Sequence, residues 1–171
     1  MADSINVLKE WTGKARATVV FDSTVDEFTD NGIFNKVKGK PNIALVGFTT
    51  DGDVFGGFYS VAVDRQDRWF FDPNIFAFSF ESHGRCMTPQ RFFVKERRRK
   101  KAFVRFEILN SNGFVRLAVF GVGGFTLGNE SSKSCCWDMS NAFEGIEDTT
   151  LTGKDFHSSS HFIRLVVIQF E

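Results

Sequence analysis

The sequence predicts a mainly β domain with a few helices: a two-sheet antiparallel β-sandwich flanked by short helices. After Asn42, apolar residues repeat with a period of two, most clearly at Phe76–Phe80. Turn-forming residues separate these runs, with Asp51-Gly52 and the segment 110–113 (Asn-Ser-Asn-Gly) as the best hairpin signals. Two short helices and about eight short strands at hairpin spacing favour the sandwich.

Composition fits one folded domain without a strong global charge. The chain has 171 residues, with 22 Phe and one Tyr, so we expect a core packed with rings that carry no hydroxyl. Lys plus Arg and Asp plus Glu both number 21, so the overall field neither attracts nor repels nucleic acid or an anionic membrane. Any electrostatic role therefore requires local clustering of charges.

The two predicted helices lie in the first 40 residues. Residues 4–11 place Ile5, Leu8 and Trp11 on one face, with Ser4 as the expected N-cap and Gly13 as the end. Residues 30–38 form the second helix, capped by Thr29 or Asp30 and ended at Gly39. We divide the chain into an N-terminal helical arm, 1–16, and a β-sandwich domain, 17–171.

The predicted strands begin at 17–22 and continue as hairpins. Runs 43–50 and 54–63 flank the Asp51-Gly52 turn, and runs 102–109 and 114–120 flank the turn at 110–113. Phe76, Phe78 and Phe80 should share one buried face, because alternate strand residues point the same way. The polar stretch 128–160 reads as long loops. The apolar run 162–170 predicts a central, buried strand.

The order of several short motifs resembles the TLDc family, known for oxidation resistance proteins. The similarity extends over 17–171 and is closest to short stand-alone protist members. It rests on the segments 20–23 (VFDS), 51–57 (DGDVFGG), 72–80 (DPNIFAFSF), 120–127 (FGVGGFTL), Ser134-Cys135 and 168–171 (IQFE). Glycines inside strands usually mark bends or close backbone approach, and here these are Gly56, Gly57, Gly121, Gly123 and Gly124.

The resemblance implies a non-catalytic interaction domain, because no enzymatic activity is firmly attached to TLDc domains. It implies a role in the oxidative-stress response and binding to the cytosolic face of the vacuolar proton pump (V-ATPase). No cofactor is implied. The N-terminus lacks a secretory signal, and no apolar run is long enough to span a membrane, so we expect a cytoplasmic or nuclear protein without membrane insertion.

The sharpest local feature is a basic run, expected to form an exposed loop between two strands. Six of seven side chains are cationic: Lys95, Arg97, Arg98, Arg99, Lys100 and Lys101. This cluster suits a polyanion, a nuclear-import receptor or an acidic partner surface. The alternative function is thus DNA binding by a stress-response transcriptional regulator. A purely structural interpretation is a solvated loop whose cations deter edge-to-edge strand pairing.

Other chemistry-bearing residues do not assemble into a site by sequence alone. Cys135 and Cys136 are candidate redox thiols, reactive only where an exposed thiolate forms. His157 and His161 lie four residues apart, but the intervening serines are poor helix formers, so a zinc site is not expected. The carboxylate pairs, such as Asp51 with Asp53, fall in turns where we expect them to be solvated. We therefore predict no catalytic or metal site.

Overall fold

The computed structural model describes residues 1–27, 29–108, 115–128, 136–154 and 160–171. The strands in this part are β1 (Ala17–Asp22), β2 (Ile43–Thr49), β3 (Val54–Tyr59), β4 (Phe70–Phe71), β5 (Phe76–Glu81), β6 (Gln90–Phe93), β7 (Ala102–Phe106), β8 (Val115–Val119), β9 (Gly123–Leu127), β10 (Cys136–Trp137) and β11 (Phe162–Phe170). The helices are α1 (Ala2–Thr12), α2 (Asp30–Val37), α3 (Met139–Ala142) and the 3₁₀ helix η1 (Glu96–Lys101).

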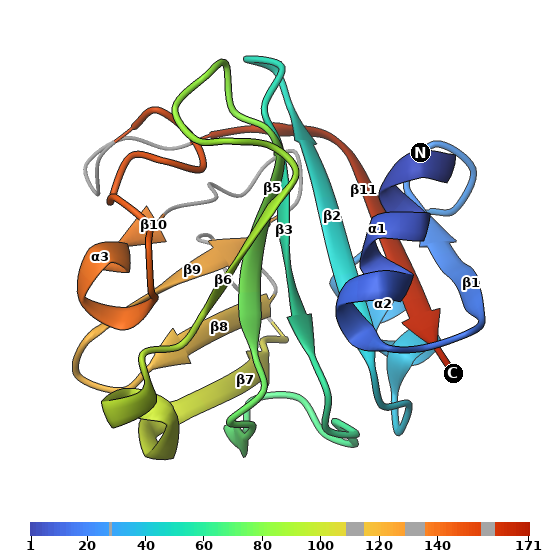
Figure 1. Ribbon diagram of the computed structural model, residues 1–171. Helices are drawn as coiled ribbons and strands as arrows, with labels where there is room; N and C mark the ends of the chain where they lie inside the picture. Colours follow the sequence, from blue (N-terminus) through green and yellow to red (C-terminus); the bar gives the residue numbers. More distant parts are fainter. Residues whose placement is uncertain (28, 109–114, 129–135, 155–159) are drawn as a thin grey trace.

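The strands form two antiparallel sheets, so the predicted fold class is confirmed (Figure 1). The larger sheet has the order β1-β11-β2-β3-β5-β6, and the smaller one has the order β10-β9-β8-β7-β4. Both predicted hairpins are present, β2 with β3 and β7 with β8. The turn at 110–113 and residues 129–135 and 155–159 of the polar stretch lie outside the described residues. The described part of that stretch was expected to be loop, but it also contains the short strand β10 and the short helix α3.

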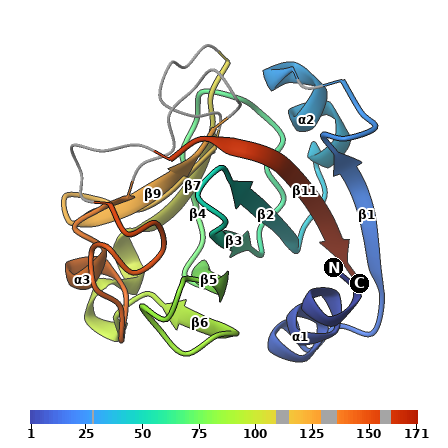
Figure 2. The same cartoon turned by 90° about the horizontal axis from the view of Figure 1, so that it is seen from above.

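The main core lies between the two sheets. It contains inward-facing side chains such as Leu45, Phe55 and Phe92 from the larger sheet and Leu117 and Phe125 from the smaller one. Helix α2 adds Ile33, Phe34 and Val37 to the same core. Helix α2 lies at one end of the sandwich, on the opposite side of β11 from α1 (Figure 2).

A second core lies on the outer face of the larger sheet, beneath α1. Phe76 and Phe78 are buried there and Phe80 is half-buried, so the three rings share one face as predicted. Trp11 of α1 covers all three, stacking on Phe80 with ring centroids 5.8 Å apart. Leu8 is fully buried in this cluster. The segment predicted as an N-terminal arm thus packs directly on the sheet.

The helix ends agree with the sequence in part. Gly13 ends α1 in the left-handed conformation, and Thr29 caps α2 by accepting a hydrogen bond from the Gly32 amide. The prediction that Ser4 caps the first helix is wrong. The helix begins two residues earlier, with Met1 at the cap and no side-chain hydrogen bond there. Ile5 already donates its amide to the Met1 carbonyl, which places Ser4 inside the first turn.

Strand β11 lies inside the larger sheet, between β1 and β2, as the apolar run predicted. Its residues alternate between the two cores. Phe162, Leu165 and Val167 face the main core, whereas Val166, Ile168 and Phe170 face the core beneath α1. Both faces are therefore apolar, which is why this strand reads as an almost continuous hydrophobic run.

The motif glycines stand where two pieces of chain meet closely. A Cβ atom on Gly56 would lie 1.8 Å from the Leu45 carbonyl oxygen, and one on Gly123 would lie 2.2 Å from the Asp138 carbonyl oxygen. Gly124 approaches the backbone of β8, and Gly57 faces the Phe125 ring across the main core. Gly121 differs, because it occupies open space at a positive φ of 68°.

None of the described helices is long and apolar enough to cross a membrane.

Candidate binding surface

The basic run forms the helical turn η1, which corrects the prediction of an irregular loop. The turn begins where Arg98 donates its amide to the Lys95 carbonyl and ends where Ala102 donates to Arg99. A 3₁₀ helix has three residues per turn, so positions 97 and 100 share one edge and 98 and 101 another. Two edges are therefore wholly cationic.

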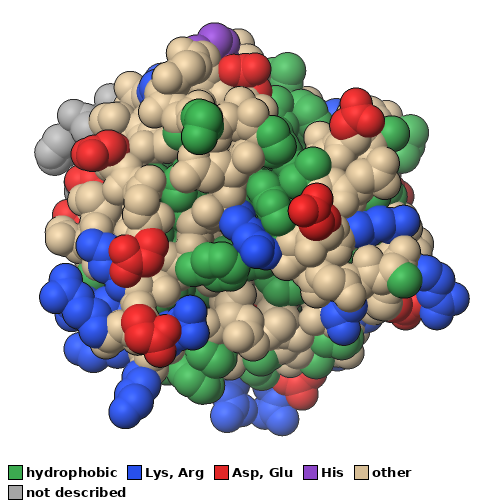
Figure 3. All heavy atoms as spheres, viewed as in Figure 1, with side chains coloured by type: hydrophobic (Ala, Val, Ile, Leu, Met, Phe, Trp, Pro, Cys, Tyr) green, Lys and Arg blue, Asp and Glu red, His purple; other side chains and the backbone are tan. Residues whose placement is uncertain are grey.

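As expected, the run is exposed to solvent, apart from Lys95 and Arg98, which are half-buried. Arg99 pairs with Glu96 at 3.0 Å, and within the described residues Glu96 is the only acidic side chain that pairs with the run. Figure 3 shows Lys and Arg side chains gathered at the lower left, over the turn between β6 and β7. This turn connects the two sheets, so its charges lie at the boundary between them.

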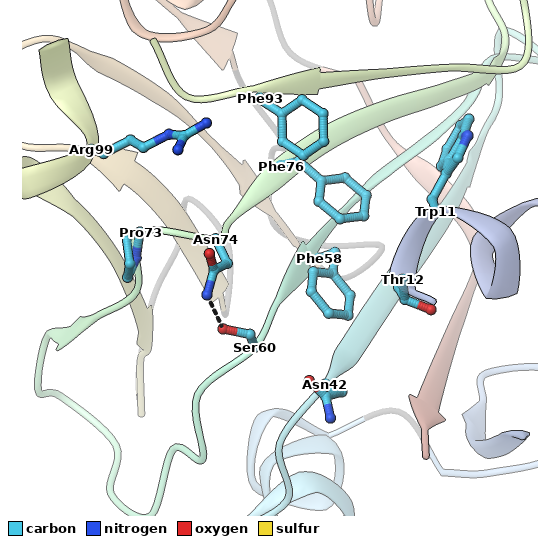
Figure 4. A pocket seen from close by; sticks show the side chains of 10 residues that line it. All are labelled: Trp11, Thr12, Asn42, Phe58, Ser60, Pro73, Asn74, Phe76, Phe93 and Arg99. Carbon is cyan, nitrogen blue, oxygen red and sulfur yellow. Dashed lines mark hydrogen bonds between the residues drawn. The ribbon is translucent and has the colours of Figure 1, made fainter. Parts of the chain in front are cut away.

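A pocket of about 280 Å³ lies beside η1, between α1 and the outer face of the larger sheet. Four of its ten lining residues are aromatic: Phe58, Phe76 and Phe93 come from three neighbouring strands, and Trp11 comes from α1 (Figure 4). Phe58 and Phe76 are stacked with centroids 4.9 Å apart, and Phe93 meets Phe76 edge-on at 5.8 Å. The lining is completed by Thr12, Asn42, Ser60, Pro73, Asn74 and Arg99.

Two guanidinium groups border these rings. Arg99 reaches toward the pocket from η1 (Figure 4). Arg91 lies over the Phe93 ring, 4.6 Å from its centroid, and is also within 5.9 Å of the centroids of Phe76 and Trp11. It donates a hydrogen bond to the Trp11 carbonyl. Cation–π contacts of this kind hold the guanidinium over the rings and fix α1 on the sheet.

A buried carboxylate organises the polar corner of the pocket. Asp72 is fully buried and accepts hydrogen bonds from the Ser60 amide, the Ser60 hydroxyl at 2.8 Å and the Asn74 amide at 2.9 Å. The Asn74 side-chain amide in turn donates to Ser60 Oγ (Figure 4). The first residue of the Asp72-Pro73 motif therefore positions two lining residues. Sequence reasoning noted the motif but not this role.

A second aromatic surface lies on the other side of η1, on the outer face of the smaller sheet. Phe71 and Phe120 are 49% and 41% exposed, and both rings contact Phe103. Trp69 packs edge-on against Phe120 at 4.8 Å. Phe120 also donates its amide to the Lys101 carbonyl, which ties this surface to the end of η1. The basic turn therefore has exposed rings on both sides.

The candidate thiols do not form an exposed pair. Cys136 is only 4% exposed and belongs to the main core, because its position in β10 points inward opposite Phe125. The interpretation of Cys136 as an exposed redox thiol is therefore wrong. Cys135 and His157 lie outside the described residues. No group of three or more His, Cys, Asp or Glu side chains suited to a metal is found in the part of the chain that the structure describes.

The prediction that the turn carboxylates are all solvated is wrong for Asp53. Its side chain is 1% exposed, accepts a hydrogen bond from the Arg85 guanidinium and lies 2.9 Å from His83 Nδ1. Arg85 also donates to the carbonyls of Thr150 and Leu151. Neighbouring Asp51 is exposed, and its hydrogen bond from Lys154 lowers its pKa. These contacts fasten the β2–β3 turn to segments that are distant in sequence.

The chain matches no protein-family model, and a search of the curated proteins gives no relative.

Proposed function

We propose that this chain is a non-catalytic binding domain of the oxidative-stress response, and that its interaction surface is η1 together with the adjoining aromatic pocket. The observation that supports this most directly is the position of Arg99, which belongs to the basic turn and also lines the pocket. Exposed cations attract an anionic partner from solution, and a concave aromatic surface beside them offers apolar contact. The buried carboxylates Asp53 and Asp72 hold other parts of the chain, which supports a structural role for them.

From the TLDc-like order of motifs we propose a first partner, the cytosolic subunits of the vacuolar proton pump. The test is capture of pump subunits from an extract of the native cell, with the tagged full chain as bait. We expect the wild type to retain them and charge reversal of Arg97, Arg98 and Arg99 to Glu to release them. Reversal of Arg16, Lys38 and Arg65, which are exposed and distant in sequence, gives a control of equal net charge. Equal capture by both variants would reject η1 as the contact surface.

A second candidate is nucleic-acid binding, favoured by the exposed rings beside Lys101. Bases stack on exposed aromatic side chains while nearby cations contact the phosphates. Phe120 provides such an exposed ring where its amide donates to the Lys101 carbonyl, and the half-buried ring of Phe103 packs against it. In this case the protein acts in the nucleus as well as in the cytosol, as a regulator of stress-response transcription.

Salt-dependent DNA binding tests this second candidate. The wild type should bind duplex or single-stranded DNA at about 50 mM salt. Its affinity should fall as the salt concentration rises, and the slope should increase with the number of phosphate contacts. Reversal of Arg97, Arg98 and Arg99 should abolish binding. Because these side chains are mostly exposed, the thermal midpoint should change little. If the wild type does not bind at low salt, the nucleic-acid function is rejected.

A further inference from the structure

We propose that the pocket between α1 and the larger sheet receives an aromatic side chain from an acidic segment of the partner protein, with the carboxylates of that segment on Arg99 and its neighbours in η1. This inference rests on the proposed protein-binding function and specifies the chemistry of the partner. It joins two features that lie side by side: a hollow lined by rings and a row of exposed cations.

The size of the pocket favours a single side chain. Pockets for drug-sized ligands and cofactors have volumes of roughly 300–1,000 Å³. The 280 Å³ pocket falls just below this range. One aromatic ring fits such a space, whereas a dinucleotide or a haem does not. Binding surfaces concentrate their affinity where one aromatic anchor enters a pocket of this kind.

The arrangement of the rings suits an aromatic guest. Phe58 and Phe76 form a stacked pair, and Phe93 and Trp11 stand at steep angles to Phe76, at 67° and 85°. An entering ring can therefore lie parallel to one wall and meet another edge-on, the two geometries that aromatic pairs prefer. Phe93 is 40% exposed, so part of this apolar surface is in contact with water until a partner covers it.

The polar lining groups favour a hydrocarbon ring over a nucleobase. The Thr12 hydroxyl donates to the Leu8 carbonyl, the Ser60 hydroxyl donates to Asp72, and the Asn74 amide donates to Ser60. The hydroxyl donors of Thr12 and Ser60 and one side-chain N–H of Asn74 are therefore already engaged inside the protein. A base has donors and acceptors along its edge that need partners, and leaving them unpaired in a pocket costs affinity. A phenyl ring has no such requirement.

The charges at the rim favour carboxylates beside the anchor. Arg99 and Arg91 border the rings, and the rest of η1 extends the positive surface. Glu96 pairs with Arg99, but its side chain is 83% exposed, and exposed pairs of this kind contribute little stability. A carboxylate of the partner can therefore replace it on Arg99 and form a charge-assisted hydrogen bond.

Peptide titrations of the full chain, followed by amide chemical shifts at low salt, test this proposal. The probes are Asp-Asp-Phe-Asp-Asp and Asp-Asp-Ala-Asp-Asp, which differ only in the anchor. We expect the phenylalanine peptide to bind about tenfold more tightly and to shift the signals of Thr12, Ser60 and Asn74. R99Q should weaken it about tenfold, whereas R65Q, an exposed change outside both η1 and the pocket, should weaken it less than about twofold.

The outcomes separate this inference from the proposed function. If both peptides bind equally and shift only η1, the pocket inference is overturned while η1 remains a binding surface. Absence of any shift at about 5 mM peptide also overturns it. If an octamer of thymidylate shifts the pocket signals at lower concentration than the phenylalanine peptide, the guest is a base and the acidic-segment proposal is wrong. If the phenylalanine peptide enters the pocket but charge reversal on η1 leaves pump capture unchanged, the inference holds and the pump binds through a different surface.

Discussion

At the scale of single residues, Gly56 illustrates how an absent side chain sets the distance between two strands. The backbone of β2 passes so close that an added Cβ atom would overlap the Leu45 carbonyl oxygen. G56A should therefore lower the free energy of unfolding by roughly 3 kcal/mol or more, since neither backbone can move without breaking its hydrogen bonds. Urea denaturation measures the change.

The control is G121A, which adds a methyl group in open space at a positive φ. It should cost only about 1 kcal/mol, the penalty of the left-handed conformation. Equal losses for G56A and G121A would show that backbone conformation, and not crowding, explains why glycine stands at these positions.

The ion pair between Asp22 and Arg164 gives a prediction about pH. Arg164 donates two hydrogen bonds to the Asp22 carboxylate and lowers its pKa to about 2. Because the folded pKa is below that of the unfolded chain, the pair stabilises the fold at pH values above about 4, and the contribution is lost as the pH falls toward about 2. R164M should cost roughly 1–2 kcal/mol at neutral pH, allowing for solvent screening of the partly exposed arginine.

Urea midpoints of the wild type and R164M at several pH values check this. The difference between the urea midpoints of the wild type and R164M should become smaller as the pH falls below about 4. R65M is the matched control, because Arg65 and Asp64 are both exposed and 3.8 Å apart, and it should have little effect at any pH. A gap that stays constant down to about pH 2 would assign the effect of Arg164 to its packing over Phe48, not to the ion pair.

Sequence patterns at this scale predict local contacts better than distant ones. The sequence limits the cap of α2 to Thr29 or Asp30, because such a cap accepts its bond from a residue only about three positions away, and Thr29 accepts it from Gly32. Asp53 was expected to be solvated because it follows a turn. Its partners His83 and Arg85 lie about 30 residues further on, and nothing in the local pattern indicates that the chain returns there.

At the scale of elements, α1 is a structural layer of the fold. It covers the outer face of the larger sheet and buries Leu8 completely. L8A should therefore lower the free energy of unfolding by about 2–5 kcal/mol, because it leaves a cavity over Phe76 and its neighbours. E10A, an exposed change on the same helix, should cost less than about 0.5 kcal/mol. A loss below about 1 kcal/mol for L8A in urea denaturation would mean that residues 1–16 are a separable arm.

Elements were predicted correctly where the period of the apolar residues and the turn-forming residues beside them indicate the same structure. The β2–β3 hairpin follows from alternation on both sides of Asp51-Gly52, and Gly52 adopts the positive φ that such a turn requires. Two elements differ from expectation for physical reasons. Helix α1 starts before Ser4 because the backbone carbonyl of Met1 closes its first turn. The turn η1 forms among like charges because it is short, exposed and held at both ends by strands.

At the scale of the whole molecule, the fold has two apolar layers, and the sequence predicted only one. The alternation in Phe76–Phe80 shows that the rings share a face but not which face looks toward the other sheet. Ala77 of the same strand faces the main core, and Phe78 faces α1. The pocket beside η1 was not predicted for the same reason, because it exists only where α1, the sheet and η1 meet.

Strand β11 holds both layers together, and its removal gives the last prediction. It pairs along its length with β1 and β2 and contributes apolar side chains to both cores. Without residues 162–171, β1 loses its only strand neighbour among the described strands, and β2 presents a new apolar edge. Exposed edges of this kind associate with other chains.

We therefore expect the truncated chain to be unfolded or insoluble, as judged by circular dichroism and by sedimentation of the expressed protein. I163A in the full chain is the control, since that side chain is 60% exposed and its loss should have little effect on either measurement. A soluble truncated protein with an unchanged spectrum would mean that the other strands fold without β11. In that case the final strand would be an addition to the sandwich, and the long apolar run that ends the sequence would need an explanation other than burial on two faces.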